Sequence, residues 1–254
     1  MSSGASLSGQ FTFYKADSEC ILYDAELVAD EIRAEPRRLF LVGSGIIQHA
    51  QKPAGEGGGI GRARVQYFHC GDMNCVLKHY YRGGMVARLL KDLYFGRNCE
   101  NSRAFREYRL LKKMQDMELP VPRAVAARVI RGLLFHRADL VTEEIEDVQT
   151  LSDVLSQRAL DADAWRSVGY CIRRFHDAGV YHADLNARNI LLGQKGEVFL
   201  IDFDNSAIRS DGNWRDANLA RLQRSLNKFR RLQQGFNFSA GNWQALLAGY
   251  KGGG

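Results

Sequence analysis

Residues 181–204 constrain the fold of this 254-residue chain more than any other segment of its sequence. They contain two short apolar runs, separated by a glycine-containing turn at 193–196. Two such runs around a glycine turn predict a β-hairpin. Asp184 lies in the loop before the first strand, Asn189 at its start and Asp202 at the end of the second. Because the outer ends of a hairpin lie side by side, we expect these three polar side chains close together.

The spacing His-x-Asp-x4-Asn, which begins at His182, is typical of the catalytic loop of kinases. In such loops the aspartate receives the proton of the acceptor hydroxyl, while the asparagine and a second aspartate hold Mg²⁺ on the nucleotide phosphates. We therefore expect Asp184 as the general base, Asn189 and Asp202 as ligands of Mg²⁺, and ATP as the phosphoryl donor. The alternative is an ordinary polar loop between a helix and a hairpin, but the joint fit of all three positions argues against it.

A glycine-rich segment upstream fits a phosphate-binding turn. Its candidate residues are Gly57, Gly58, Gly59 and Gly61. Glycines let a backbone fold closely over phosphates and point its N–H groups at them, although a flexible surface loop would have the same composition. A short apolar strand then ends at Lys78, where kinases place the lysine that contacts the α- and β-phosphates. A solvated lysine at the end of a strand is the alternative.

An amphipathic helix is expected over residues 101–118, because apolar residues recur there at helical spacing. Glu107 lies beside this apolar stripe and is the candidate partner of Lys78 in an ion pair. The alternative is a pair within the helix with Arg103, four residues earlier. Two prolines shortly after the helix prevent its continuation.

The remaining pattern predicts an α+β, two-lobed protein-kinase-like fold. Residues 1–143 would form an N-terminal lobe with an antiparallel sheet and one helix, and residues 144–254 a mainly helical C-terminal lobe. Glu143 would lie in the hinge, where backbone groups can hydrogen-bond to adenine. The further expected elements are strands at 124–130 and 132–142, helices at 150–157 and 162–178 with Asp161 or Asp163 as N-cap of the second, and the hairpin strands 189–192 and 197–202.

The composition indicates the general class of protein and the compartment expected for it. A hydrophobic content of 45% is ordinary for a globular protein, and no apolar run is long enough to span a bilayer. The N-terminus shows no basic segment followed by an apolar one, so a secretory signal is not expected. The five cysteines are odd in number and form no Cys-x-x-Cys pair, which favours reduced thiols in a cytosolic compartment over disulfide bonds.

The net charge of +6 indicates an anionic partner. Part of it lies in a basic amphipathic helix whose charged residues are Arg221, Arg224, Lys228, Arg230 and Arg231. The simpler interpretation is a core helix with a solvated charged face, and it is favoured over contact with an anionic membrane surface.

The residues after Asp202 narrow the class of substrate. Only about fifty residues remain, and they contain no Ala-Pro-Glu motif. Asp204 stands where protein kinases carry glycine. The platform that holds a peptide substrate is therefore expected to be absent, which favours a small-molecule or sugar acceptor.

The chain resembles the Kdo (3-deoxy-D-manno-octulosonic acid) kinases of the lipopolysaccharide core kinase family of Gram-negative bacteria. The resemblance covers most of the chain from about residue 55 onward. It rests on the segments 78–84, 103–107, 181–191 and 201–204, extended by Trp214, Arg215, Asn218, Leu219, Arg221 and Leu222. The Tyr-Tyr-Arg-Gly-Gly run in the first segment and the Asp-Phe-Asp ending of the last are its more specific parts.

The resemblance implies ATP-dependent phosphorylation of the 4-hydroxyl of Kdo on Kdo–lipid A, during lipopolysaccharide biosynthesis. It implies a peripheral enzyme on the cytoplasmic side of the bacterial inner membrane, with no nucleic-acid partner and no obligate protein partner. Arg82, Gly83 and Gly84, with Tyr81, would belong to the acceptor site, because arginine suits carboxylates and phosphates. A plain turn after a strand is the alternative for these residues.

Two other functions remain open. One is a kinase-like phosphotransferase for a heptose, an aminoglycoside or other small molecule, or a protein. The other is a catalytically inactive kinase fold that binds a lipid or a partner. The joint presence of Lys78, Glu107, Asp184, Asn189 and Asp202 argues against the inactive fold, because a binding module does not need all five.

Overall fold

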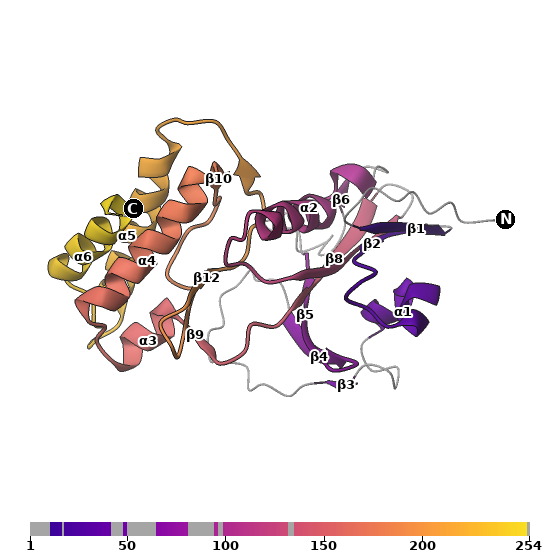
Figure 1. The fold of residues 1–254 in the computed structure, drawn as a ribbon, viewed down its shortest axis with the longest axis horizontal. Coiled ribbons are helices and arrows are strands. Elements are labelled where there is room, and N and C mark those ends of the chain that lie inside the picture. Colours follow the sequence, from indigo (N-terminus) through magenta and orange to yellow (C-terminus); the bar gives the residue numbers. More distant parts are fainter. Residues whose placement is uncertain are drawn as a thin grey trace. The chain divides into compact units, whose positions relative to one another are not determined.

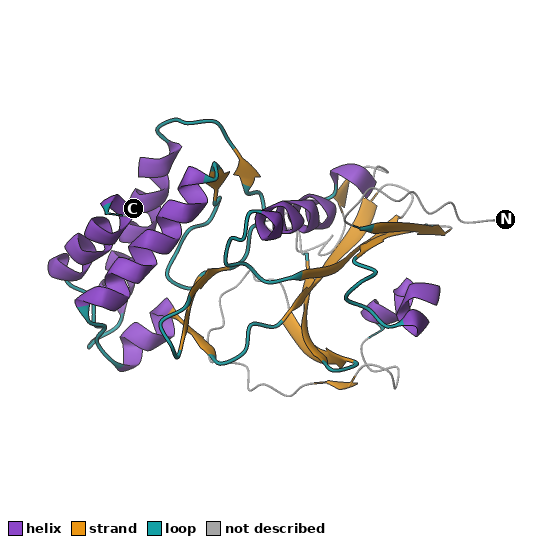
Figure 2. Ribbon diagram, viewed as in Figure 1, coloured by secondary structure: helices purple, strands orange, loops and turns teal. Residues whose placement is uncertain are grey.

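The computed structural model describes residues 11–16, 18–41, 48–49, 65–80, 94–95, 99–131 and 135–252 (Figure 1). The chain forms two compact units. The N-terminal unit comprises Met1–Lys112 and Arg123–Glu144, and the C-terminal unit comprises Lys113–Pro122 and Ile145–Gly254. The first is rich in strands and the second in helices (Figure 2), so the α+β class is confirmed. The two units are not divided at a single point of the chain, because residues 113–122 pack with the C-terminal unit. The single lobe boundary expected at 143/144 therefore stays a prediction.

An antiparallel sheet forms most of the described part of the N-terminal unit. Its strands are β1 (Thr12–Ala16), β2 (Glu19–Tyr23), β3 (Gln48–His49), β4 (Val65–Cys70), β5 (Met73–His79), β6 (Tyr94–Phe95), β7 (Ala124–Arg131) and β8 (Phe135–Glu143). The order is β1-β2-β7-β8-β5-β4-β3, and β6 also pairs with β8. The expected strands at 124–130 and 132–142 are thus present as β7 and β8, a neighbouring pair in the middle of the sheet.

Among the described residues, three short helical segments and one long helix accompany this sheet. They are α1 (Asp30–Ala34), η1 (Pro36–Phe40), η3 (Cys99–Asn101) and α2 (Arg103–Asp116). Helix α2 confirms the amphipathic helix expected at 101–118, because its apolar stripe, including Phe105, Tyr108 and Met114, is fully buried. The hydroxyl of Ser102 accepts a hydrogen bond from the Phe105 N–H at 3.2 Å and so satisfies one free donor at the start of the helix.

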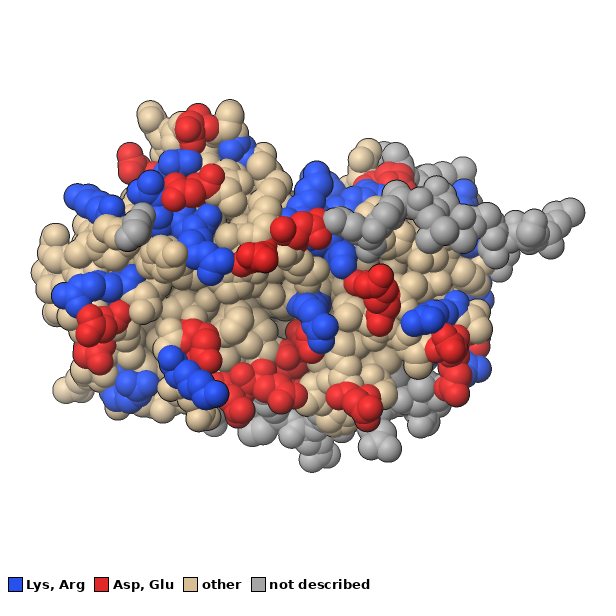
Figure 3. All heavy atoms as spheres, in the orientation of Figure 1, with Lys and Arg blue, Asp and Glu red and all other residues tan. Residues whose placement is uncertain are grey.

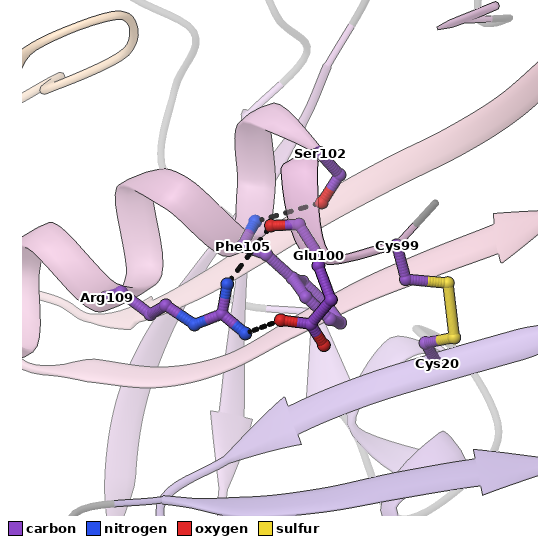
Figure 4. The surroundings of a disulfide bond; sticks show 6 residues. All are labelled: Cys20, Cys99, Glu100, Ser102, Phe105 and Arg109. Carbon is purple, nitrogen blue, oxygen red and sulfur yellow. Dashed lines mark hydrogen bonds and ion pairs between the residues drawn. A yellow bond between two sulfur atoms is a disulfide. The ribbon is translucent and has the colours of Figure 1, made fainter. Parts of the chain in front are cut away.

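A disulfide bond joins Cys20 on β2 to Cys99, immediately before α2 (Figure 4). Their Cα atoms are 6.5 Å apart, within the usual range for a disulfide. The expectation that all cysteines stay reduced is therefore wrong. The two cysteines are 79 residues apart in sequence, and the fold of the sheet brings them together, which neither motif spacing nor counting reveals.

The other three cysteines, Cys70, Cys75 and Cys171, are free and buried. Burial raises the pKa of each of these thiols, and that of Cys171 rises to about 12. They therefore stay protonated near neutral pH and act as small apolar side chains of the core.

The C-terminal unit consists of four helices and short strands in its described residues. The helices are α3 (Leu151–Gln157), α4 (Ala162–Asp177), α5 (Trp214–Leu232) and α6 (Ala240–Lys251), and the strands are β9 (Val148–Thr150), β10 (Val180–Tyr181), β11 (Ile190–Gly193), β12 (Val198–Leu200) and β13 (Ala207–Ile208). Strands β11 and β12 pair antiparallel and confirm the expected hairpin. Asp161, rather than Asp163, caps α4, because its carboxylate accepts from the Ala164 N–H at 2.8 Å.

Helices α4 and α6 cross at two glycines. A Cβ atom on Gly169 would lie 2.0 Å from the carbonyl oxygen of Leu246, and one on Gly249 would lie 2.1 Å from that of Arg166. Only hydrogen in place of a side chain allows the two backbones to approach this closely. Of the helices in the described ranges, none is both long and apolar enough to cross a membrane.

We predict that Gly249→Ala lowers the free energy of unfolding of the C-terminal unit by about 1–3 kcal/mol, because the added methyl group forces α4 and α6 apart. Gly241→Ala on the same helix is the control, since its Cβ would meet only the Ser239 hydroxyl at 3.7 Å. That change should stabilise the helix by up to ~1 kcal/mol. Urea unfolding followed by tryptophan emission measures both effects, because Trp165, Trp214 and Trp243 all lie in the C-terminal unit. Equal shifts for the two variants would contradict the close crossing.

Candidate active site

An ion pair joins β5 to α2 within the N-terminal unit. Lys78 Nζ lies 3.0 Å from Glu107 Oε1 and 2.9 Å from Oε2, and the Glu107 side chain is buried. The pair expected from the sequence is thus present. Arg103, the alternative partner of Glu107, lies with its guanidinium 5.5 Å from the ring centroid of Tyr80.

Tyr80 is a further member of this cluster that sequence reasoning did not assign a role. Its side chain is buried, and its hydroxyl donates a hydrogen bond to Glu107 Oε2. Lys78 Nζ also lies 4.8 Å from the centre of the tyrosine ring. A buried carboxylate is costly unless donors surround it. Lys78 and Tyr80 supply these donors, and the arrangement fixes the ammonium group of Lys78 in one place.

The residue next to Lys78 ties the same strand to its neighbours. His79 Nδ1 contacts the buried carboxylate of Asp139 on β8, which also accepts from Arg128 on β7 at 2.6 and 2.8 Å. Burial alone would raise the pKa of Asp139, but the hydrogen bond from His79 and the charge of Arg128 outweigh it and hold that pKa below its usual value. The strand that carries Lys78 is therefore anchored on its other face.

In the C-terminal unit, Asp184 lies in the loop between β10 and β11. Its carbonyl oxygen accepts from the side-chain amides of Asn186 and Asn189, each at 2.9 Å. One carboxylate oxygen, Oδ2, accepts from Asn186 at 3.0 Å, and the other, Oδ1, lies 2.7 Å from Arg221 Nη1. The carboxylate itself is about half exposed, so it is held in place and still open to a reactant.

His182 connects this loop to the segment that leads to Asp202. Its Nδ1 accepts from the Asp184 N–H at 3.1 Å, so Nε2 carries the proton and donates to the carbonyl oxygen of Ile201 at 3.0 Å. The imidazole is buried and its ring centroid lies 4.7 Å from that of Phe203. One neutral ring thus sets the relative position of the two chain segments.

Asn189 and Asp202 lie next to each other, because the Ile201 N–H donates to the Asn189 carbonyl oxygen at 3.0 Å. Asp202 has a φ of 65°, a left-handed conformation that is uncommon outside glycine. Both neighbours of Asp202 are fixed. The backbone of Ile201 is hydrogen-bonded to His182 and Asn189, and the buried ring of Phe203 stacks on Phe175. Backbone strain of this kind concentrates at functional sites.

The donor set around Asn189 and Asp202 fits Mg²⁺. This ion prefers oxygen ligands and is commonly bound through one or two protein side chains together with phosphate oxygens and water. The side-chain nitrogen of Asn189 donates to the Asp184 carbonyl oxygen, so Asn189 would bind a cation through its side-chain oxygen. No group of three or more His, Cys, Asp or Glu side chains suited to a metal occurs in the described ranges, and a site of the Mg–nucleotide type does not require one.

Helix α5 supports the loop through a row of polar side chains whose contacts with the loop were not predicted from the sequence. Asn218 is buried, accepts from the His182 N–H at 3.2 Å and donates to the His182 carbonyl oxygen at 3.0 Å. Ser225 accepts from the Ala187 N–H at 3.3 Å. With Arg221 these residues follow a spacing of three and four, so they share one face of the helix. Arg221 is also one of the charged residues of the exposed face, but its contact with the loop, like those of Asn218 and Ser225, depends on packing between segments that are distant in the sequence.

The remaining candidates are only partly placed. Gly57, Gly58, Gly59, Gly61, Arg82, Gly83 and Gly84 lie outside the described residues, so their roles stay predictions. Glu143 ends β8, and its N–H donates to the Arg123 carbonyl oxygen at 2.9 Å. The N–H of Glu144 donates to the Asn74 carbonyl oxygen at 2.8 Å. Hydrogen bonds from this segment to adenine would therefore use other backbone atoms than these two N–H groups.

Comparison with known proteins supports the same class of protein. Residues 48–250 match the lipopolysaccharide kinase (Kdo/WaaP) family. A protein of Actinobacillus succinogenes named 3-deoxy-D-manno-octulosonic acid kinase is 41% identical over 183 residues, which are 70% of this chain and 76% of the relative. Proteins of the same name from Haemophilus influenzae and Vibrio vulnificus are 39% and 36% identical, over 76% and 77% of this chain and 83% and 82% of theirs.

The family match covers most of the chain and includes the segments that hold Lys78, Glu107, Asp184, Asn189 and Asp202. It confirms the resemblance that the sequence motifs indicated. The chain is a kinase and belongs to the lipopolysaccharide kinase (Kdo/WaaP) family.

Proposed function

We propose that this kinase transfers the γ-phosphoryl group of ATP to the 4-hydroxyl of Kdo on Kdo–lipid A, in lipopolysaccharide biosynthesis. The observation that carries the proposal is the loop at Asp184, with Asn189 and Asp202 beside it, in a chain whose relatives are named 3-deoxy-D-manno-octulosonic acid kinases. The proposed sugar is taken from the names of those relatives, and the proposed reaction, phosphoryl transfer to a hydroxyl, from the residues of the loop.

In this proposal, Asp184 accepts the proton of the sugar hydroxyl while the hydroxyl oxygen forms a bond to the γ-phosphorus. The bond between this phosphorus and the oxygen that links it to the β-phosphate breaks, and ADP leaves with that oxygen. Asn189 and Asp202 would hold Mg²⁺, which neutralises negative charge on the phosphates when bound. Lys78, fixed by Glu107 and Tyr80, would contact the α- and β-phosphates.

A direct assay tests the substrate. The purified chain, incubated with Mg-ATP and Kdo–lipid A, should add one phosphate to the acceptor, as detected by mass spectrometry, and fragmentation should place it at O4 of Kdo. Heptose-containing acceptors, an aminoglycoside and a generic protein substrate serve as comparisons, because these are the alternative acceptors that the sequence motifs leave open. Phosphorylation of one of these, with none of Kdo–lipid A, would refute the proposed substrate.

Separate roles for the two aspartates give a second prediction. Asp184→Ala should reduce turnover by roughly two to four orders of magnitude, the usual contribution of a positioned base, and leave nucleotide binding largely intact. Asp202→Ala should instead weaken the binding of Mg-ATP, measured by titration calorimetry. The control is Asp163→Ala, at an exposed residue on α4 whose ion pair with Arg166 contributes little. Equally mild effects of both active-site changes would rule out this division of roles.

We also propose that the exposed basic face of α5 contacts anionic lipid on the cytoplasmic side of the inner membrane, so that the enzyme acts as a peripheral protein. Leu219, Leu222 and Leu226 are buried, so the apolar face of α5 belongs to the core, as the simpler interpretation of the sequence held. Arg224, Lys228 and Arg231 are exposed and available for a surface. Basic and acidic side chains are interspersed on the face drawn in Figure 3, so the proposal rests on this helix and not on a single basic area there.

Replacing Arg224, Lys228 and Arg231 together with Gln should lower co-sedimentation with anionic liposomes and activity on Kdo–lipid A. Each basic residue near such a surface contributes on the order of 1 kcal/mol, screened over a Debye length of about 8–10 Å. Raising the salt concentration should therefore mimic the variant, and activity on a soluble Kdo glycoside should be spared. The control replaces three other exposed bases, Lys113, Arg158 and Lys195, with Gln and makes the same change in net charge. Unchanged sedimentation of the α5 variant at low salt would disprove the contact.

A further inference from the structure

The guanidinium group of Arg221 lies directly on the candidate general base. Arg221 comes from α5, 37 residues beyond Asp184, and its Nη1 is 2.7 Å from Asp184 Oδ1. The arginine and aspartate side chains are 45% and 55% exposed. A cation of the protein therefore occupies one oxygen of the carboxylate that the acceptor hydroxyl must reach.

This ion pair is not needed to hold the loop. The backbone of Asp184 is fixed by His182, Asn186 and Asn189, and its second oxygen by Asn186. Helix α5 is tied to the loop independently, through Asn218 and Ser225. An ion pair this exposed contributes little to stability, because water competes for both charges. Arg221 can therefore exchange Asp184 for another anion at small cost.

The anion that fits is the carboxylate of the acceptor. The hydroxyl that reacts must lie within hydrogen-bond reach of Asp184, so the acceptor comes within a few ångströms of Arg221. In the pyranose ring of a 2-ulosonic acid such as Kdo, the carboxyl group is attached to C2, two ring carbons from the hydroxyl on C4. A guanidinium binds a planar carboxylate through two parallel hydrogen bonds, which an ammonium or an amide cannot reproduce.

We propose that Arg221 recognises the carboxylate of the acceptor sugar and leaves Asp184 Oδ1 as it does so, which frees that oxygen to accept the proton of the hydroxyl. This inference rests on the proposed function and adds the residue that selects the sugar. A neutral sugar offers no anion to Arg221, so the arginine stays on Asp184 and competes with the hydroxyl for the base. Arg221 thus favours acidic acceptors, because only these draw it away from the general base Asp184.

The test pairs a change in the enzyme with a matching change in the acceptor. A soluble Kdo glycoside and its carboxamide, which lacks the negative charge, are compared for wild type, Arg221→Gln, Arg221→Lys and Arg158→Gln. Arg158 is the control, because it is an exposed arginine of the same unit, at the end of α3. Circular dichroism and tryptophan emission establish that each variant is folded.

With wild type, loss of the carboxylate should lower kcat/KM by about 10- to 100-fold, the range expected for a charge-assisted hydrogen-bonded pair. Arg221→Gln should lose a similar factor with the natural acceptor, mainly through the KM of the acceptor and not that of ATP. This variant should then show little further loss with the carboxamide. Arg221→Lys should recover part of the discrimination, and Arg158→Gln should discriminate as wild type does.

Two outcomes would overturn the inference while leaving the proposed function intact. In one, the losses from Arg221→Gln and from the carboxamide multiply, which means that the two groups do not interact. In the other, Arg221→Gln lowers kcat equally with both acceptors, which would make it a residue that only positions Asp184. If wild type phosphorylates no Kdo acceptor at all, the proposed function fails, and the inference fails with it.

Discussion

The candidate active site depends on the two hydrogen bonds made by the buried imidazole of His182. The ring joins its own loop to Ile201, 19 residues later, and Ile201 in turn is bonded to Asn189. Because Nδ1 accepts a hydrogen bond from the loop and Nε2 donates one to the strand end, only one neutral tautomer satisfies both contacts. Asn218 holds the backbone of the same histidine from α5. The positions of Asp184, Asn189 and Asp202 therefore follow from one ring and its partners.

In the N-terminal unit, a buried charged group, Glu107, fixes the position of a candidate active-site residue. Glu107 is buried on α2, and its two oxygens are satisfied by Lys78 and by Tyr80. Removing either partner would leave the buried carboxylate without enough donors, which costs free energy. The same cluster holds the lysine at the end of β5. The same hydrogen bonds to Glu107 thus stabilise the core and fix the ammonium group of Lys78.

Local patterns in the sequence predicted the elements that local physics determines. The amphipathic helix around Glu107, the strands β7 and β8 and the hairpin β11–β12 follow from apolar periodicity and from turn residues. The ion pair of Lys78 and Glu107 could be predicted because a motif fixes the order of its two elements. The disulfide between Cys20 and Cys99, and the contacts of Asn218 and Arg221 with the loop, could not be predicted in this way. They depend on packing between segments that are far apart in the chain, for which a single sequence carries no local signal.

The row of polar residues on α5 also limits how this chain can vary. Asn218, Arg221 and Ser225 reach the loop only because their spacing keeps them on one face of the helix. Each residue turns an α-helix by about 100°, so one inserted or deleted residue between Asn218 and Ser225 would point the later side chains away from the loop. Substitutions on the exposed side leave this register intact. The spacing of these three residues, more than the identity of the bases on the exposed side of the helix, is thus the property on which the support of the loop depends.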